Sequence, residues 1–175
     1  SRNRDQTRLL ANQLSANLET YRRPLATLAS TASHRPLYQH QVLLDGEWPI
    51  GDLEVFDAGV LVVDEAGTIV AAVPDSLHLY GQSFPTLVPE TSASRPDDLG
   101  LTDILAQAIG DKRIIALSYP VADGSGGDRG AVVGLFQADR SATRTSRFYR
   151  HIWELYIGRE ETAYLVDGNG RVIFH

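Results

Sequence analysis

The chain has 175 residues, of which 43% are hydrophobic and 22% charged, values that fit one folded domain and exclude a disordered, collagen-like or coiled-coil chain. It contains no cysteine and no methionine, which excludes a disulfide framework, a thiolate metal site and a cysteine nucleophile. The net charge of −6 divides into +4 over residues 1–44, −12 over residues 45–128 and +2 over residues 129–175, and so acidic a middle argues against a nucleic-acid partner.

Residues 1–33 predict a long amphipathic helix. Pro24 has no amide hydrogen for the Thr20 carbonyl, so we expect a kink or break near Arg22 and Arg23. A helix with one narrow apolar stripe is expected to pack on a sheet or on a second copy of itself. The stripe consists of residues spaced three or four apart, namely Leu10, Leu14, Leu18, Tyr21, Leu25 and Leu28.

The clearest strand signal lies in residues 55–74. Two apolar runs, Val60–Val63 and Thr68–Val73, flank a short turn that ends at Gly67, which predicts a β-hairpin. Residues 34–54 before it show no clear period, and residues 76–98 after it are rich in Pro, Ser and Asp and are expected to form loop.

Residues 99–157 are predicted to form two helices and two strands. The apolar spacing in residues 99–110 predicts a short amphipathic helix that ends at Gly110. Residues 113–121 and 131–138 predict two strands joined by a glycine-rich turn. Residues 141–157 predict another amphipathic helix.

The last segment, residues 162–175, predicts a second hairpin that repeats the first. Leu165–Ile173 matches Val62–Val70 at an offset of 103 residues, with apolar residues before an Asp, a Gly three residues later and apolar residues after it. Two such hairpins, each preceded by a helix, indicate a duplicated module.

These elements, in this order and over most of the chain, resemble the double Cache family, the PAS-like extracytoplasmic sensor domains of bacterial receptors. The resemblance implies an α+β fold in which a PAS-like antiparallel sheet packs on the long N-terminal helix. The segments that carry the resemblance are Val63–Val70, Pro120–Asp123, Ala131–Gly134 and Tyr164–His175.

The resemblance also implies a division of the chain into three parts. Residues 1–33 would be a spine helix, residues 34–140 a membrane-distal sensing module, and residues 141–175 a linking helix with the first hairpin of a membrane-proximal module. Because the remaining strands of that proximal module are missing and no membrane-spanning run is present, we expect a piece of a longer protein, excised from between two membrane helices.

Family members of this kind bind a small molecule in the distal module and pass the signal to a cytoplasmic output domain. The resemblance therefore implies the periplasmic or extracellular part of a cell-membrane receptor, first of all a sensor histidine kinase. We expect this domain to have no catalytic activity, no cofactor and no metal of its own.

The ligand is expected to be a small molecule other than an amino acid. The amino-acid-binding members carry an Arg-x-Trp-Tyr run and an Asp on the last distal strand, whereas this chain lacks that run and aligns Phe136 with the Asp. Aromatic rings combined with one cation suit a small carboxylate. The candidate ligand-binding residues are Tyr80, Phe84, Asp103, Arg113 and Tyr119.

Other readings of the sequence have less support. Gly81–Pro85 begins like a nucleophile elbow but lacks its final glycine, and Asp167–Gly170 lacks the later ligands of a calcium loop. A small hydrolase would need a catalytic group that the sequence does not show. The alternative is an intracellular PAS- or GAF-like dimerisation module without a soluble ligand. If the chain is instead an extracytoplasmic sensor domain, the leucine stripe of the first helix still predicts a homodimer.

Overall fold

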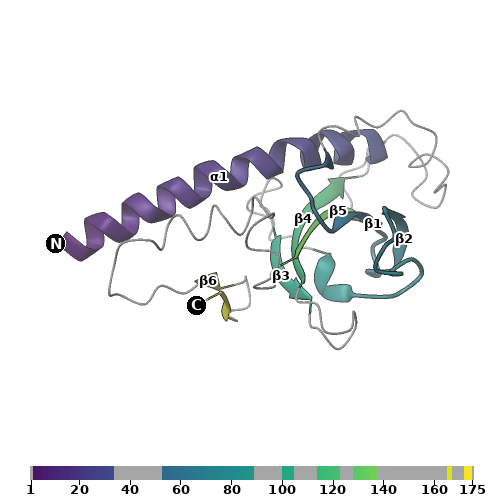
Figure 1. Cartoon of the computed structure of the whole chain (residues 1–175). Helices are drawn as coiled ribbons and strands as arrows, with labels where there is room; N and C mark the ends of the chain where they lie inside the picture. The colour runs from purple at the N-terminus through teal and green to yellow at the C-terminus, as the bar shows by residue number, and fades with distance from the viewer. Residues whose placement is uncertain are drawn as a thin grey trace.

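The computed structural model describes residues 2–33, 53–88, 100–104, 114–122, 128–137, 165–166 and 172–174. The helix α1 (Arg2–Ser33) lies along one face of a five-stranded antiparallel sheet (Figure 1). The expected α+β class, with a PAS-like antiparallel sheet packed on a long N-terminal helix, is confirmed. In sheet order the strands are β2 (Ile69–Val73), β1 (Gly59–Val63), β5 (Asp128–Gln137), β4 (Ile114–Ala122) and β3 (Gly100–Ile104).

The sheet carries one apolar cluster on each face. The helix face packs against α1, and the covered face packs beneath Asp75–Val88, which we name the covering segment. Along β1, Val60 and Val62 belong to the helix face, while Leu61 and Val63 belong to the covered face. A strand that is buried on both faces needs apolar residues at every position, which explains the unbroken apolar run in the sequence.

The second half of α1 is anchored on the sheet by aromatic rings. Tyr21 is buried, and its ring centroid lies 5.0 Å from that of Phe136 and 6.2 Å from that of Phe56. The predicted apolar stripe is confirmed from Leu18 to Leu28, whereas the side chains of Leu10 and Leu14 lie outside the described ones. The buried helix residues are Tyr21, Leu25, Leu28, Ala29 and Ala32.

α1 continues through Pro24, so of the kink or break predicted near Arg22 and Arg23 the break does not occur. A proline inside a helix removes one hydrogen bond, here the one to the Thr20 carbonyl, and costs about 3 kcal/mol. Burial of Tyr21 before the proline and of Leu25 after it holds both sides of the helix on the same sheet. Tertiary packing therefore outweighs the local preference to break.

Asp64 organises the turn of the β1–β2 hairpin. Its Oδ1 accepts hydrogen bonds from the amides of Ala66 at 3.0 Å and Thr68 at 2.8 Å. The Asp64 carbonyl accepts another from the amide of Gly67 at 3.0 Å. Gly67 has a φ of +82°, which is the left-handed conformation predicted for the last residue of this turn.

Replacing Asp64 by alanine is expected to lower the free energy of unfolding by about 1–2 kcal/mol, because two turn amides lose their acceptor. The matched control is Glu65→Ala, since Glu65 is its exposed neighbour, with an expected change within about 0.5 kcal/mol. Chemical denaturation of both variants measures the difference. Equal losses would show that the Asp64 carboxylate does not hold the turn.

The second hairpin, formed by β6 (Leu165–Val166) and β7 (Val172–Phe174), reproduces the backbone pairing of the first. Both hairpins shift register between two consecutive residues of their first strand. The sequence repeat of 103 residues therefore extends to the pattern of strand pairing and to the position of the irregularity. The corresponding pairs are Val62–Ala71 with Leu165–Phe174, and Val63–Ile69 with Val166–Val172.

The prediction of a helix over residues 99–110 is wrong for Gly100–Ile104, which form the edge strand β3. β3 pairs with β4 from Gly100 opposite Ser118 to Ile104 opposite Ile114. The apolar spacing of so short a segment fits either structure, and pairing with β4 satisfies the backbone groups of the strand. Residues 105–110 lie outside the described residues.

The strands predicted at residues 113–121 and 131–138 are confirmed as β4 and β5. The glycine-rich turn predicted at residues 123–130 is wrong for residues 128–130, which already belong to β5, where Asp128 pairs with Ala122. Residues 123–127 of that turn and the helix predicted at residues 141–157 lie outside the described residues.

Candidate functional site

The covering segment is fixed to the β1–β2 hairpin by backbone hydrogen bonds. The amide of Ile69 donates to the Gln82 carbonyl at 2.8 Å, and the Ile69 carbonyl accepts from the amide of Gly81 at 2.9 Å. The amide of Phe84 donates to the Gly67 carbonyl at 2.8 Å. These bonds extend the edge of β2 and hold the segment across the sheet, as antiparallel strand pairing does.

Apolar side chains of the covering segment then close the covered face. Leu79 is 1% exposed and Leu87 is fully buried in the covered-face cluster. Within the segment, the Asp75 carboxylate accepts a hydrogen bond from the amide of Leu79 at 2.7 Å, which fixes the position of that leucine. The result is a water-excluding apolar layer of the kind that lines small-molecule sites.

Ser118 places one polar group in this apolar layer. Its side chain is 1% exposed, and its Oγ has no hydrogen-bond partner among the described residues. Ile114 and Ala116 of the same strand belong to the covered face, so strand alternation puts Ser118 there as well. An unpaired buried hydroxyl costs about 1–3 kcal/mol, whereas a bound molecule that hydrogen-bonds to it removes that cost.

Ser118 was missed by the sequence reasoning, although a signal for it exists. In the run Ile114, Ala116, Ser118 the third residue is the single polar member of one strand face. A lone hydroxyl in the interior of an otherwise apolar strand is a better indicator of a buried polar anchor than aromatic residues in loops.

The structure separates the sequence-predicted site residues instead of gathering them. Phe84 is half-buried against the covered-face cluster, and Tyr80 of the same segment is 50% exposed. Tyr119 packs on the other side, against the helix-face cluster. Asp103 lies in β3 opposite Ile115, and Arg113 lies outside the described residues.

Tyr119 is part of a polar contact between the sheet and α1. The guanidinium of Arg22 donates a hydrogen bond from Nε to Glu19 Oε2 at 2.9 Å. Side-chain hydrogen bonds with Glu19 and then with Tyr119 raise the pKa of Arg22, while desolvation lowers it. Arg22 therefore stays a cation and ties the Tyr119 hydroxyl of β4 to the helix.

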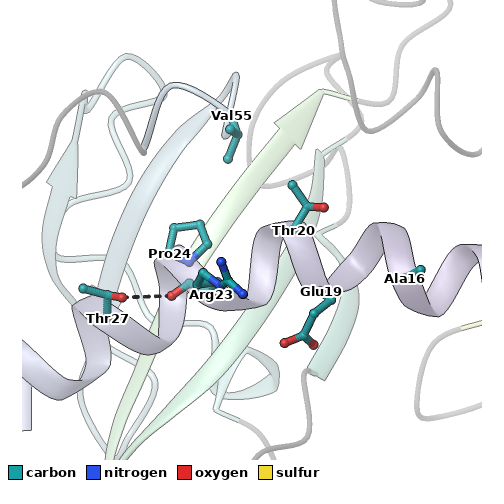
Figure 2. Close-up of a pocket in the computed structure, with 7 residues that line it drawn as sticks. All are labelled: Ala16, Glu19, Thr20, Arg23, Pro24, Thr27 and Val55. Atoms are coloured by element: carbon teal, nitrogen blue, oxygen red, sulfur yellow. Dashed lines mark hydrogen bonds between the residues drawn. The ribbon is translucent and has the colours of Figure 1, made fainter.

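An open groove of about 510 Å³ lies between α1 and Val55, and Figure 2 shows the residues that line it. Among the lining residues, Pro24 and Val55 are half-buried and all the others are exposed. Small-molecule sites enclose about 70–90% of their ligand, which so open a groove does not do. The lining residues are Ala16, Glu19, Thr20, Arg23, Pro24, Thr27 and Val55.

Within the described residues, no three His, Asp or Glu side chains come together as a cation site would require. None of the described helices combines the length and apolar character needed to cross a bilayer.

No protein-family model matches the sequence, and no curated protein matches it. Among solved structures, the chain is similar to an extracellular ligand binding receptor from Desulfohalobium retbaense DSM5692, with a TM-score of 0.47 and 22% identity over 82% of this chain and 27% of that one. It is also similar to the sensor domain of the V. cholerae histidine kinase DctB, with a TM-score of 0.42 and 15% identity over 85% of this chain and 58% of that one. This chain thus spans less than two thirds of either protein.

Proposed function

We propose that this chain is an extracytoplasmic ligand-sensing domain of a bacterial transmembrane receptor, of the kind that controls a sensor histidine kinase. In this proposal a small molecule binds at the covered face of the sheet and changes the conformation of the domain. The observation that carries the proposal is Ser118, a buried hydroxyl without a partner among the described residues, on a face closed by the covering segment. The PAS-like fold and the sequence resemblance support the sensory role.

The ligand that fits this site is small and mostly apolar, with a polar group for Ser118. Phe84 at the covered face supplies an aromatic wall. We favour a small carboxylate, because its oxygens can accept the hydrogen bond that the buried Ser118 hydroxyl can donate. In the full-length protein the domain is then expected to lie outside the membrane, between two membrane-spanning segments.

Ligand binding is tested by a thermal-shift screen of the chain with small carboxylates, amines, purines and sugars. A ligand present at a hundred times its Kd stabilises the folded state by about 2.7 kcal/mol, which is a readily measured rise in Tm. If no class of compound raises Tm, or if the full gene encodes no membrane-spanning segments on either side of this region, the proposal fails.

If the proposal holds, replacing Ser118 by alanine preserves or raises the stability of the ligand-free protein but weakens its response to the ligand. The ligand-free protein is expected to be unchanged or up to about 1 kcal/mol more stable, because an unpaired buried hydroxyl is removed. The Tm rise caused by the ligand is expected to shrink. Ser76→Ala, at an exposed serine of the covering segment, is the matched control and should change neither value. A destabilised S118A protein with undiminished ligand response would contradict the assignment.

We also propose that two copies of the domain pair through the first half of α1. This half extends beyond the sheet (Figure 1), and Leu9 is 66% exposed on it. Leu9→Glu is expected to convert a dimer to a monomer in sedimentation experiments, while Asn12→Glu, at an exposed polar position, should have a smaller effect. A wild-type chain that stays monomeric at high concentration would overturn this proposal.

A further inference from the structure

We propose that β4 couples the covered face of the sheet to α1 through two consecutive residues, Ser118 and Tyr119. The inference rests on the proposed function, because it takes the covered face as the ligand site. It adds the route by which occupancy of that site reaches the helix.

The strand itself places the two side chains on opposite faces. Ile115 and Leu117 belong to the helix face, and Ala116 belongs to the covered face. Pairing of β4 with β5 stays in register from Ile114 to Pro120, so this alternation is unbroken at Ser118 and Tyr119. A single rigid peptide unit joins a group on one face to a group on the other, and a displacement of Ser118 therefore moves Tyr119.

Tyr119 is the residue of β4 that makes a polar contact with α1. Its hydroxyl shares the Arg22 guanidinium with Glu19, which lies one helical turn before Arg22. The contact is directional, unlike the apolar packing around it, so it reports small changes in the position of β4.

The contact also lies beside a weak point of the helix. Arg22 is two residues before Pro24, which cannot donate a hydrogen bond to the Thr20 carbonyl. Helices bend most readily where this ladder is interrupted. A shift of β4 is thus applied to the turn of α1 whose backbone hydrogen bonding is interrupted, within the part of the helix that Tyr21 and Leu25 pack on the sheet. Displacements of about 1–2 Å are enough to switch contacts of this kind.

The test uses the absence of cysteine in the chain, since Ser118→Cys then introduces its single thiol. Methyl methanethiosulfonate adds a methylthio group at that thiol and stands in for an occupant of the covered face. Amide chemical shifts of α1 between Glu19 and Thr27 are compared before and after labelling. Ser118→Val, which adds bulk without a reagent, provides a second readout.

We expect labelling of S118C to shift the α1 amides around Arg22, and the shifts to fall at least several-fold when Tyr119→Phe is added. That variant keeps the ring in place and removes only the hydroxyl. Arg22→Gln should have the same effect, while Arg23→Gln, at the exposed neighbouring arginine, should leave the shifts intact.

Two results would overturn the inference. The first is a response confined to the strands and the covering segment, with α1 unchanged in both S118C and S118V. The second is an α1 response that persists undiminished with Tyr119→Phe, which would assign the coupling to apolar packing. Neither result depends on a natural ligand, so failure of the ligand screen and failure of the coupling are distinguished.

Discussion

Replacing Phe136 by alanine is expected to lower the free energy of unfolding by about 3–5 kcal/mol. Phe136 is fully buried on the helix face of β5. Its ring meets Tyr21 of α1 edge-on, with an interplanar angle of 78°, and its centroid lies 5.3 Å from that of Phe56. Truncation leaves a cavity between the helix and the sheet and removes two aromatic contacts, each worth about 0.5–1.5 kcal/mol beyond the area that it buries.

Denaturant unfolding measures this loss as a lower midpoint with little change in the slope. Phe136→Leu is the graded control and is expected to lose clearly less, because most of the buried volume is kept. Since small domains are stable by about 5–15 kcal/mol, F136A leaves a marginal fold. A loss below about 1.5 kcal/mol would show that α1 is not anchored by this aromatic cluster.

Replacing Gly130 by alanine is expected to be comparably severe, for a different reason. Gly130 has a φ of +116°, where side chains are strained. An added Cβ would overlap the carbonyl oxygen of Val63 and lie 2.7 Å from the carbonyl carbon of Asp64. These are backbone atoms of the neighbouring hairpin and cannot rotate away. We expect a loss of about 3 kcal/mol or more, or a failure to accumulate as soluble protein.

The variant Gly81→Ala separates the effect of backbone strain from the effect of steric overlap. Gly81 has a φ of +78°, but an added Cβ there meets no atom within 4 Å. This variant therefore carries only the backbone strain, for which about 1 kcal/mol is expected. Unfolding measurements on both variants give the steric part by difference. If both variants lose the same free energy of unfolding, β5 does not pack against the first hairpin as closely as the structure shows.

The sequence predicted the elements whose signal is local. The apolar stripe of α1 from Leu18 to Leu28, the turn residues Asp64 and Gly67 and the apolar runs of β4 and β5 match the fold. The failures arose where a partner outside the segment itself decides its structure. Gly100–Ile104 became a strand because β4 was available to pair with it. The helix passed through Pro24 because its two sides rest on one sheet.

The candidate site was harder to predict than the fold, because membership of a sheet face depends on register. Phe84 and Tyr119 are aromatic residues that the prediction assigned to one site, yet the sheet places them on opposite sides. Ser118 is inconspicuous in the sequence and gains its meaning from burial without a partner. The sequence could suggest which residue types bind a ligand, but only strand pairing shows which of them face the same space.

The order of the strands also constrains when the domain can form. β5 is the last of the five in the chain, yet it lies in the middle of the sheet between β1 and β4. Until residues 128–137 have been synthesised, the first hairpin lacks the strand that joins it to β4 and β3, and such distant pairing is slow to form. A nascent chain with this topology remains loose over most of its synthesis. That property suits the function proposed above, in which the domain would cross a membrane before it folds.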